Sequence, residues 1–212
     1  MNVAHVIPAV PAEEPVIILL RHAARPPLPV GEPGSEVSIT PDGAVQAEEL
    51  GRQLGPFLAS IRTSPLRRCR ETAAALCRGS AQEVPSIDDR HLGDPGVFIA
   101  DPELAWRAWR LRGHDAVLNH LAAGAPPLPG FNDPLEATLT LVDHLLAHAT
   151  GPGLHIAITH DALLIPLVVA LRGPPLLTPE WPGFLEAAAL WRSGPSLYLH
   201  YRGTTTSSGR VR

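Results

Sequence analysis

The chain has 212 residues, a net charge of −4, and 45% hydrophobic against 18% charged residues. This length is enough for one domain with a sizeable core, and the composition is typical of a soluble globular protein. All 17 basic residues are arginine, which excludes mechanisms that need a lysine amine, such as P-loop, Schiff-base and pyridoxal-phosphate chemistry. The negative charge gives no reason to expect nucleic acid as a partner.

The first predicted strand covers residues 16–20, which are all apolar. Arg21 and His22 follow it directly, and Arg25 and two prolines come after them. A continuous apolar run is typical of a parallel strand buried on both faces. Open α/β sheets bind their ligands at the carboxyl ends of strands, so these three side chains are candidates for anion binding. The alternative is a strand followed by a solvated basic turn.

A predicted helix begins after Thr40 as its N-cap. A short second strand is predicted over 59–63, and it leads to Ser64 and Pro65, which favour a second helix beginning there. Arg68 lies in the first turn of this helix. The positive end of the helix dipole suits a phosphate group.

The two cysteines, Cys69 and Cys77, fall on this same predicted helix. Eight residues along a helix separate them by roughly 12 Å, which is too far for a disulfide. We therefore expect a reduced, cytoplasmic protein. Residues 1–15 do not have the pattern of a signal peptide, and no apolar stretch is long enough to span a bilayer, so we expect no membrane partner.

The middle of the chain contains a third predicted strand over 83–89, then Asp94, then a helix that begins at Asp101. This helix carries Trp106 and Trp109 interleaved with arginines. We favour an amphipathic surface helix with the tryptophans inward and the arginines outward. The alternative is that these side chains stack on an anionic, partly flat substrate.

A further helix is predicted from Asp133 to about residue 149. His144 and His148 stand four residues apart on it, a spacing that can bind a metal ion. No Glu lies between them, and helical geometry places both on the solvent side. We interpret them as surface histidines and expect no metal site.

The last buried strand, 154–159, ends at His160 and Asp161. Two closing strands are predicted over 186–191 and 196–201. His160 thus stands after a late strand as His22 stands after the first one.

Four segments in this order resemble the histidine phosphatase superfamily, which includes the phosphoglycerate mutases and the histidine acid phosphatases. Arg21-His22-Ala23 resembles its Arg-His-Gly signature, and Ile39-Thr40 with the Gly-x-x-Gln-Ala that follows resembles the segment after it. Residues 64–73 resemble its Ser-Pro-Leu-x-Arg-Ala-x-x-Thr-Ala. The fourth segment is the second core histidine, at His160.

The resemblance implies that His22 is the nucleophile and forms a phosphohistidine. It implies that Arg21, Arg25 and Arg68 bind the phosphate and that His160 donates to the transferring phosphoryl group. No cofactor and no metal ion are implied.

The resemblance leaves two candidates for the proton donor. His160-Asp161 matches the His-Asp of the histidine acid phosphatases, which also carry the Arg-x-Pro found at Arg25, and this favours Asp161. Asp94 falls where mutase-like members place their acid.

The expected fold is a three-layer α/β/α sandwich with a mostly parallel central sheet, like that of phosphoglycerate mutase. We expect a flexible arm at 1–15, one histidine phosphatase domain at 16–203 with a small cap insertion near 94–130, and a disordered tail at 204–212. The expected function is hydrolysis of a small phosphomonoester. The alternatives are a mutase-like phosphotransferase, or a catalytically weak phosphate-binding or scaffold member, because Ala23 replaces the motif glycine. A homodimer stays open.

Overall fold

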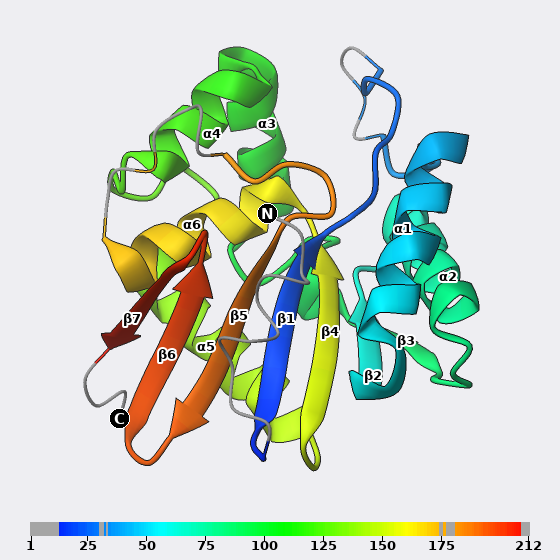
Figure 1. The fold of residues 1–212 in the computed structure, drawn as a ribbon. Helices are drawn as coiled ribbons and strands as arrows, with labels where there is room; N and C mark the ends of the chain where they lie inside the picture. The colour runs from blue at the N-terminus through cyan, green and yellow to red at the C-terminus, as the bar shows by residue number, and fades with distance from the viewer. Residues whose placement is uncertain (1–12, 30–31, 33, 174–175, 177–180, 209–212) are drawn as a thin grey trace.

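The computed structural model describes residues 13–29, 32, 34–173, 176 and 181–208. Within them, seven strands form one sheet in the order β3-β2-β4-β1-β5-β6-β7, with helices on both faces (Figure 1). The strands are β1 (Pro15–Arg21), β2 (Leu58–Thr63), β3 (Ser86–Asp88), β4 (Gly153–Thr159), β5 (Ala187–Ser193), β6 (Ser196–Tyr201) and β7 (Thr204–Ser208). The α-helices are α1 (Pro41–Leu54), α2 (Arg67–Ser80), α3 (Pro102–Arg112), α4 (His114–Ala122), α5 (Pro134–His148) and α6 (Asp161–Arg172). The described residues also contain the short 3-10 helices η3 (Gly55–Phe57) and η4 (Arg90–Leu92).

The parallel part of the sheet is formed by β3, β2, β4 and β1, whereas β5, β6 and β7 continue it in antiparallel fashion. The predicted α/β fold is confirmed, with four of the seven strands parallel. β4 lies between β1 and β2, so the strands predicted at 16–20, 59–63 and 154–159 are neighbours. Their carboxyl ends meet at one edge of the sheet, where this class of fold places its site.

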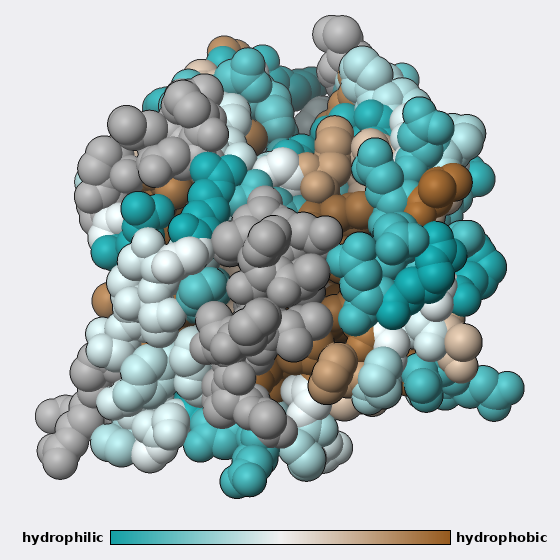
Figure 2. Space-filling model, viewed as in Figure 1, coloured by the Kyte–Doolittle hydropathy of each residue, from teal (hydrophilic) through white to brown (hydrophobic). Residues whose placement is uncertain are grey.

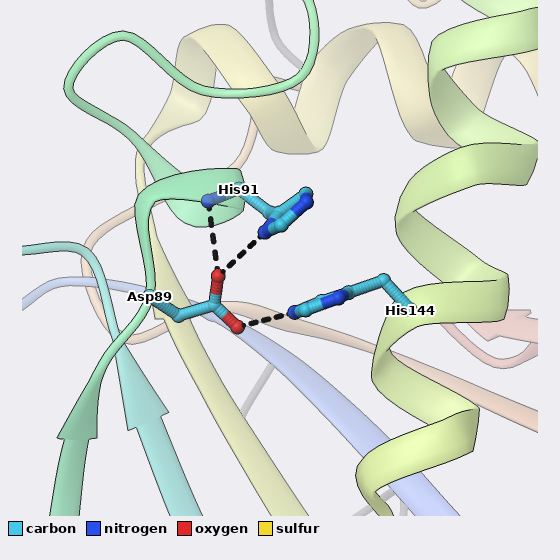
Figure 3. A group of neighbouring side chains, drawn as sticks. All are labelled: Asp89, His91 and His144. Carbon is cyan, nitrogen blue, oxygen red and sulfur yellow. Dashed lines mark hydrogen bonds and ion pairs between the residues drawn. The ribbon is translucent and has the colours of Figure 1, made fainter.

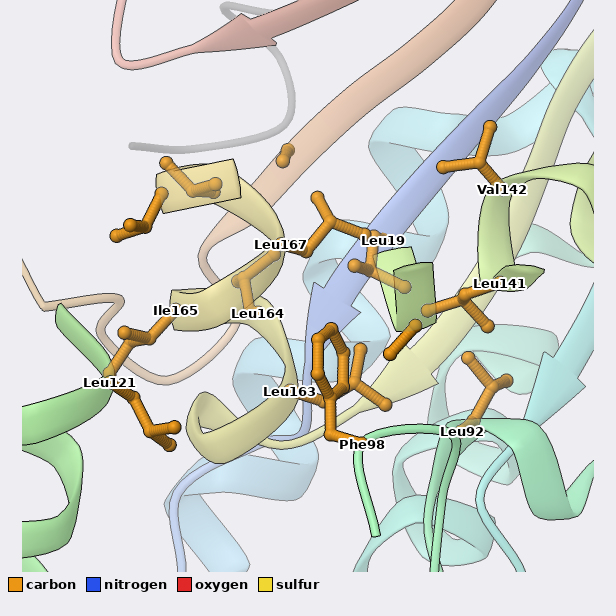
Figure 4. Packing of buried hydrophobic residues seen from close by; sticks show 14 of the residues in the cluster. Leu19, Leu92, Phe98, Leu121, Leu141, Val142, Leu163, Leu164, Ile165 and Leu167 are labelled. Atoms are coloured by element: carbon orange, nitrogen blue, oxygen red, sulfur yellow. The ribbon is translucent and has the colours of Figure 1, made fainter. Parts of the chain in front are cut away.

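The side chains of β1 alternate between two cores, as the pleat of a strand requires. Ile17 and Leu19 pack with α5 and α6 in one cluster of buried residues. Val16, Ile18 and Leu20 pack with α1 and α2 in the other. Figure 4 shows the first cluster around α6. The apolar run of β1 therefore holds together both helical layers of the sandwich.

The two predicted helix starts near the site differ in outcome. Thr40 caps α1 as predicted, and its Oγ1 accepts a hydrogen bond from Gly43 N at 3.0 Å. α2 begins only at Arg67, with Leu66 as the N-cap, so the prediction that Ser64 caps it is wrong. Ser64 Oγ instead accepts from Leu66 N at 3.4 Å within the turn before the helix. The outer side of α1 and α2 is mostly hydrophilic (Figure 2).

The C-terminal region corrects the sequence analysis. Residues 204–208, predicted to be disordered, form the edge strand β7 and pair antiparallel with β6. The two strands are joined by Arg202 and Gly203, which both have positive φ, at 49° and 77°. Two positive φ angles are typical of the tight turn that matches strand twist in hairpins. The arm at 1–12 and the end of the tail at 209–212 lie outside the described residues.

The predicted insertion near 94–130 contains α3 and α4, which lie over the carboxyl edge of the sheet (Figure 1). Position 130, at the end of the insertion, has to be glycine, because a Cβ there would approach Ala105 N to 2.4 Å. Ala100 N and Asp101 N both donate to Gly130 O, at 2.9 and 3.1 Å.

In the part of the chain that the structure describes, no helix combines the length and hydropathy needed to cross a membrane.

Candidate active site

A cavity of about 800 Å³ opens at the edge where β1 and β4 end. Its polar end is lined by His22, Arg68, His160 and Asp161. Three of these four side chains follow the ends of β1 and β4, and Arg68 comes from the first turn of α2. The topology therefore brings together residues that the sequence separates widely.

His22 is held in one tautomer. Its Nδ1–H donates a hydrogen bond to Ala23 O at 2.8 Å, and its Nε2 accepts a hydrogen bond from Arg68 Nε at 3.2 Å. The side chain is 1% exposed, and burial, together with the charges of Arg68 and Arg21, lowers the pKa of His22 to about 3. Above that pH the imidazole is neutral and its Nε2 carries a free electron pair.

Ala23, in place of the motif glycine, keeps the carbonyl that holds His22. It is absent from the described non-glycine residues with positive φ, so its backbone needs no glycine. Its N–H donates to Thr72 Oγ1 at 3.0 Å, and Thr72 Oγ1 donates to Arg68 O at 2.7 Å. Thr72 thus links the turn after β1 to α2, a role that sequence analysis missed although it quoted the Thr of this motif.

Arg68 lies at the centre of the polar end and is 6% exposed. Besides His22, it donates to Gly34 O at 2.9 Å and to His160 Nδ1 at 3.3 Å. Arg25 lines the same cavity, and its buried Nε has no hydrogen-bond partner among the described residues. A buried guanidinium N–H without a partner is costly unless an acceptor, such as a phosphate oxygen, reaches it.

His160 closes the polar end opposite His22, with 5.4 Å between ring centroids. Since its Nδ1 accepts from Arg68, its Nε2–H donates to Ser64 Oγ at 3.0 Å. Burial and the charge of Arg68 hold the pKa of His160 well below its usual range. Gly93 packs against this pair so closely that a Cβ would lie 2.7 Å from Ser64 Oγ and 2.9 Å from His160 Nε2.

Arg21 lies behind the cavity rather than in its lining. Its NH2 forms an ion pair with Asp161 Oδ2 at 2.7 Å, its NH1 donates to Pro182 O at 2.6 Å, and the guanidinium stacks 4.3 Å over the Phe184 ring. Its Nε is buried without a partner among the described residues. Arg21 therefore fixes Asp161, and phosphate binding by it stays a prediction.

Asp161 begins α6, and three groups surround its carboxylate. Oδ1 accepts from Ala162 N at 2.8 Å, and Oδ2 lies 2.7 Å from Arg21 NH2 and 3.8 Å from His114 Nε2. Burial alone would raise the pKa of Asp161, but the neighbouring His114 and the charge of Arg21 hold it well below its usual range. Asp161 is therefore a carboxylate in the ligand-free protein.

His114 was not identified in the sequence. Trp109 Nε1 donates to His114 Nδ1 at 3.3 Å, so the proton of a neutral His114 is on Nε2, which faces Asp161. The His114 side chain is 41% exposed. It connects Asp161 with solvent, and only the fold of the cap reveals this contact.

Asp94, the second candidate acid, lines the cavity but is exposed. It has a φ of 64° and no hydrogen bond or ion pair with another described residue. The two acids thus differ, since Asp161 is fixed at the polar end and Asp94 stands free on the wall.

The tryptophans of α3 correct the sequence interpretation. Trp106 and Trp109 both line the cavity, and Arg110 lines it with them. Arg107 and Arg112 are exposed, as predicted. The inward face of α3 covers a cavity as well as a core, a difference that helical spacing does not show.

A second histidine cluster lies outside the cavity (Figure 3). Asp89 Oδ1 accepts from His91 N at 3.0 Å and from His91 Nδ1 at 2.9 Å, and Oδ2 accepts from His144 Nε2 at 2.7 Å. His144 is 20% exposed, so its assignment as a surface residue is wrong, because η4 covers that side of α5. His148 is exposed as predicted.

The ligand atoms of Asp89, His91 and His144 lie within 4.8 Å of one another, and this donor set could hold a transition-metal ion. However, Arg62 NH1 also reaches Asp89 Oδ2, at 3.2 Å. The carboxylate therefore has four donors already, and a cation bound there would face a guanidinium. The fit favours a structural network that links η4 with α5.

Comparison with known proteins gives one family. Residues 17–117 match the sequence model of the histidine phosphatase superfamily, branch 1. No curated protein sequence matches the chain.

Several solved structures share the fold. YhfR from Bacillus stearothermophilus is 21% identical, with a TM-score of 0.61, and the match covers 90% of this chain and 98% of that one. A mycobacterial glucosyl-3-phosphoglycerate phosphatase in complex with VO3 is 21% identical, with a TM-score of 0.53 and coverage of 84% and 96%. A phosphoserine phosphatase from Entamoeba histolytica is 17% identical, with a TM-score of 0.54 and coverage of 82% and 89%. These matches and the family model confirm the resemblance.

Proposed function

We propose that this chain, a member of the histidine phosphatase superfamily, hydrolyses a phosphomonoester through a phosphohistidine on His22. The observation that carries the proposal is the tautomer of His22. Its Nδ1–H is bound by Ala23 O, and its Nε2 electron pair points to the guanidinium of Arg68. A nucleophile that is aimed at a cation is poised for an anionic substrate.

Phosphate binding in this proposal uses the cations of the cavity. Arg68 and Arg25 line it, and the unpartnered Nε of Arg25 offers one further donor. The phosphoryl oxygens take over the bonds that Arg68 now makes to His22 and His160. Donors fixed in place before the substrate arrives are usually the largest single contribution to catalysis.

The reaction has two steps. His22 Nε2 attacks phosphorus, the bond from phosphorus to the ester oxygen breaks, and Asp161 protonates the leaving alkoxide. Water then attacks phosphorus, the P–N bond breaks, and the Asp161 carboxylate takes the water proton. When Arg68 turns to the phosphoryl oxygens, His160 donates to the phosphoryl group in both steps as the tautomer with its proton on Nδ1, and its Nε2 then accepts from Ser64 Oγ.

Asp161 must be protonated before the first step. It is ionised in the ligand-free protein. An incoming phosphate dianion raises the pKa of a nearby carboxyl group. His114, whose side chain is 41% exposed, can deliver the proton in two moves: solvent protonates Nδ1 in place of the Trp109 hydrogen bond, and the Nε2 proton then passes to Asp161 Oδ2, 3.8 Å away. Asp94 is the alternative donor, because it lines the same cavity.

Two other functions share this site. A mutase-like phosphotransferase returns the phosphoryl group from His22 to a substrate instead of water. A scaffold member binds phosphate without turnover, an alternative raised by Ala23. The intact bond from His22 Nδ1 to Ala23 O favours catalysis over the scaffold.

The proposal is tested by release of inorganic phosphate from 4-nitrophenyl phosphate. We expect turnover in the wild-type protein and in the control His148→Ala, and a loss on the order of 10⁴-fold or more in His22→Ala. Turnover should be unchanged in EDTA, because every step uses protein side chains. Phosphate transfer without release indicates a mutase, and activity retained in His22→Ala excludes the phosphohistidine.

The location of the protein remains part of the proposal. Cys69 and Cys77 are both free thiols. Free thiols are common in the reducing cytoplasm, which supports the cytoplasmic location expected from the sequence.

A further inference from the structure

The cavity has a second end that the phosphate chemistry does not use. Away from His22, the walls of the cavity are apolar and aromatic. They are formed by the loop after η4, by α3 and by Phe131, which lies shortly before α5. The side chains that dominate this end are Phe98, Ile99, Trp106, Trp109 and Phe131. A cavity of about 800 Å³ is far larger than a phosphate ion and lies within the range that encloses drug-sized ligands.

This aromatic end is built rather than loosely folded. Trp109 stacks on Phe131 with ring centroids 5.3 Å apart and planes at 27°. Its indole N–H is already used by His114 Nδ1, so the ring has no polar atom left to satisfy. Phe131 in turn pairs with Ile99 through a backbone bridge and donates its N–H to Leu128 O at 2.9 Å. Rings that are fixed in this way bind an apolar group with little loss of side-chain freedom.

The charges in the lining argue against a second anionic group on the substrate. Apart from the polar end and Arg25, which is assigned to the phosphate, the ionisable side chains that line the cavity are Glu32, Asp94, Arg110 and His114. Two of them are acids and only one is an arginine. A carboxylate or a second phosphate beyond the scissile group would therefore meet as much repulsion as attraction.

We infer that the substrate is a phosphomonoester of an aromatic alcohol, with its phosphate at His22 and its ring between Trp106, Trp109 and Phe98. The inference rests on the proposed function and adds the class of the leaving group. Burial of one aromatic ring corresponds to about a 10- to 100-fold gain in kcat/KM over a substrate without the ring.

The direct test compares 2-phenylethyl phosphate with ethyl phosphate. Both release a primary alkoxide of similar basicity, so the chemical step is matched and the ratio of kcat/KM reports on the aromatic end. We expect 2-phenylethyl phosphate to be favoured about 10- to 100-fold. 3-Phosphoglycerate, which carries a carboxylate, should be no better than ethyl phosphate.

Variants of α3 locate the effect. Trp106→Ala should reduce the ratio of kcat/KM towards one, and Trp109→Phe, which keeps a ring, should preserve most of it. The matched control is Leu111→Ala, because Leu111 lies on the same helix but is 76% exposed. It should leave the ratio unchanged. Circular dichroism confirms that each variant is folded.

Binding separates failure of this inference from failure of the proposed function. If neither ester is hydrolysed, the proposed function fails, and the phosphonates 2-phenylethylphosphonate and ethylphosphonate still test the aromatic end through thermal stabilisation. Stronger stabilisation by the phenyl compound, lost in Trp106→Ala, supports the inference. Any of four results overturns the inference. These are a kcat/KM ratio near one, a ratio that Trp106→Ala leaves unchanged, a preference for 3-phosphoglycerate, and equal stabilisation by the two phosphonates.

Discussion

The cluster around Arg68 and the cluster around Asp89 contain the same residue types but have different roles. At Asp89, one carboxylate accepts from four donors, which belong to His91, His144 and Arg62 (Figure 3). At Arg68, cations and neutral imidazoles crowd a cavity, and the buried Nε atoms of the neighbouring Arg21 and Arg25 have no partner among the described residues. A satisfied cluster holds structure together, whereas one with excess donors is built for an anion.

After the loss expected in His22→Ala, the largest effect separates the two candidate acids in the cavity. Asp161→Asn removes the proton and keeps the shape, so kcat/KM for an alkyl phosphate should fall about 10²–10⁴-fold. The value for 4-nitrophenyl phosphate should change little, because its leaving oxygen barely needs a proton. Asp94→Asn is the control and should show little dependence on the leaving group. If the two variants exchange these behaviours, the donor is Asp94.

The next effect tests whether the Arg68 cluster is an anion site. Orthovanadate at about 100 times its Kd should stabilise the protein by about 2.7 kcal/mol in thermal unfolding. Arg68→Gln should abolish this stabilisation. Arg70→Gln should keep it, since Arg70 lies on the same helix but is exposed and pairs with Asp88. If millimolar vanadate does not stabilise the wild-type protein, the contrast between the two clusters is lost.

The Asp89 cluster should affect stability and leave the chemistry alone. Its hydrogen bonds from His144 and His91 outweigh burial, which acts in the opposite direction, and lower the pKa of Asp89 from 3.8 to about 2. A depressed carboxyl pKa contributes stability that is present above pH 4 and lost as the pH falls towards 2, here about 2 kcal/mol.

Asp89→Asn should therefore lower the free energy of unfolding by about 2 kcal/mol at pH 7 and by much less near pH 2. Urea unfolding at several pH values measures this difference. Turnover of 4-nitrophenyl phosphate at pH 7 should remain within a few-fold of the wild-type value. A large loss of activity with unchanged stability would show that this cluster takes part in the reaction.

The polar end of the cavity was predictable because its residues follow strand ends. His22 and His160 stand directly after apolar runs, and parallel strands bring their carboxyl ends to one edge. Arg68 was predictable in spite of the wrong start for α2, since a shift of the helix start does not move it away from that edge.

The contacts of the cap and of the Asp89 cluster were not predictable, for a different reason. Helical spacing shows which face of α3 or α5 is apolar, but not what lies against it. Trp106 faces a cavity and His144 faces η4, and both contacts depend on how distant segments pack. His114 has no motif, and its contact with Asp161 exists only because α4 folds back over the sheet. β7, in contrast, had a local signal in Arg202-Gly203.

The phosphoenzyme itself tests the central claim most directly. In Asp161→Asn, 4-nitrophenyl phosphate should still phosphorylate His22, while attack by water slows, so the intermediate should accumulate. Quenching in alkali, which preserves phosphohistidine, followed by peptide mass spectrometry should find one phosphoryl group, on His22. Release of nitrophenol with no phosphoryl group on His22, or with the group on another residue, would contradict the account.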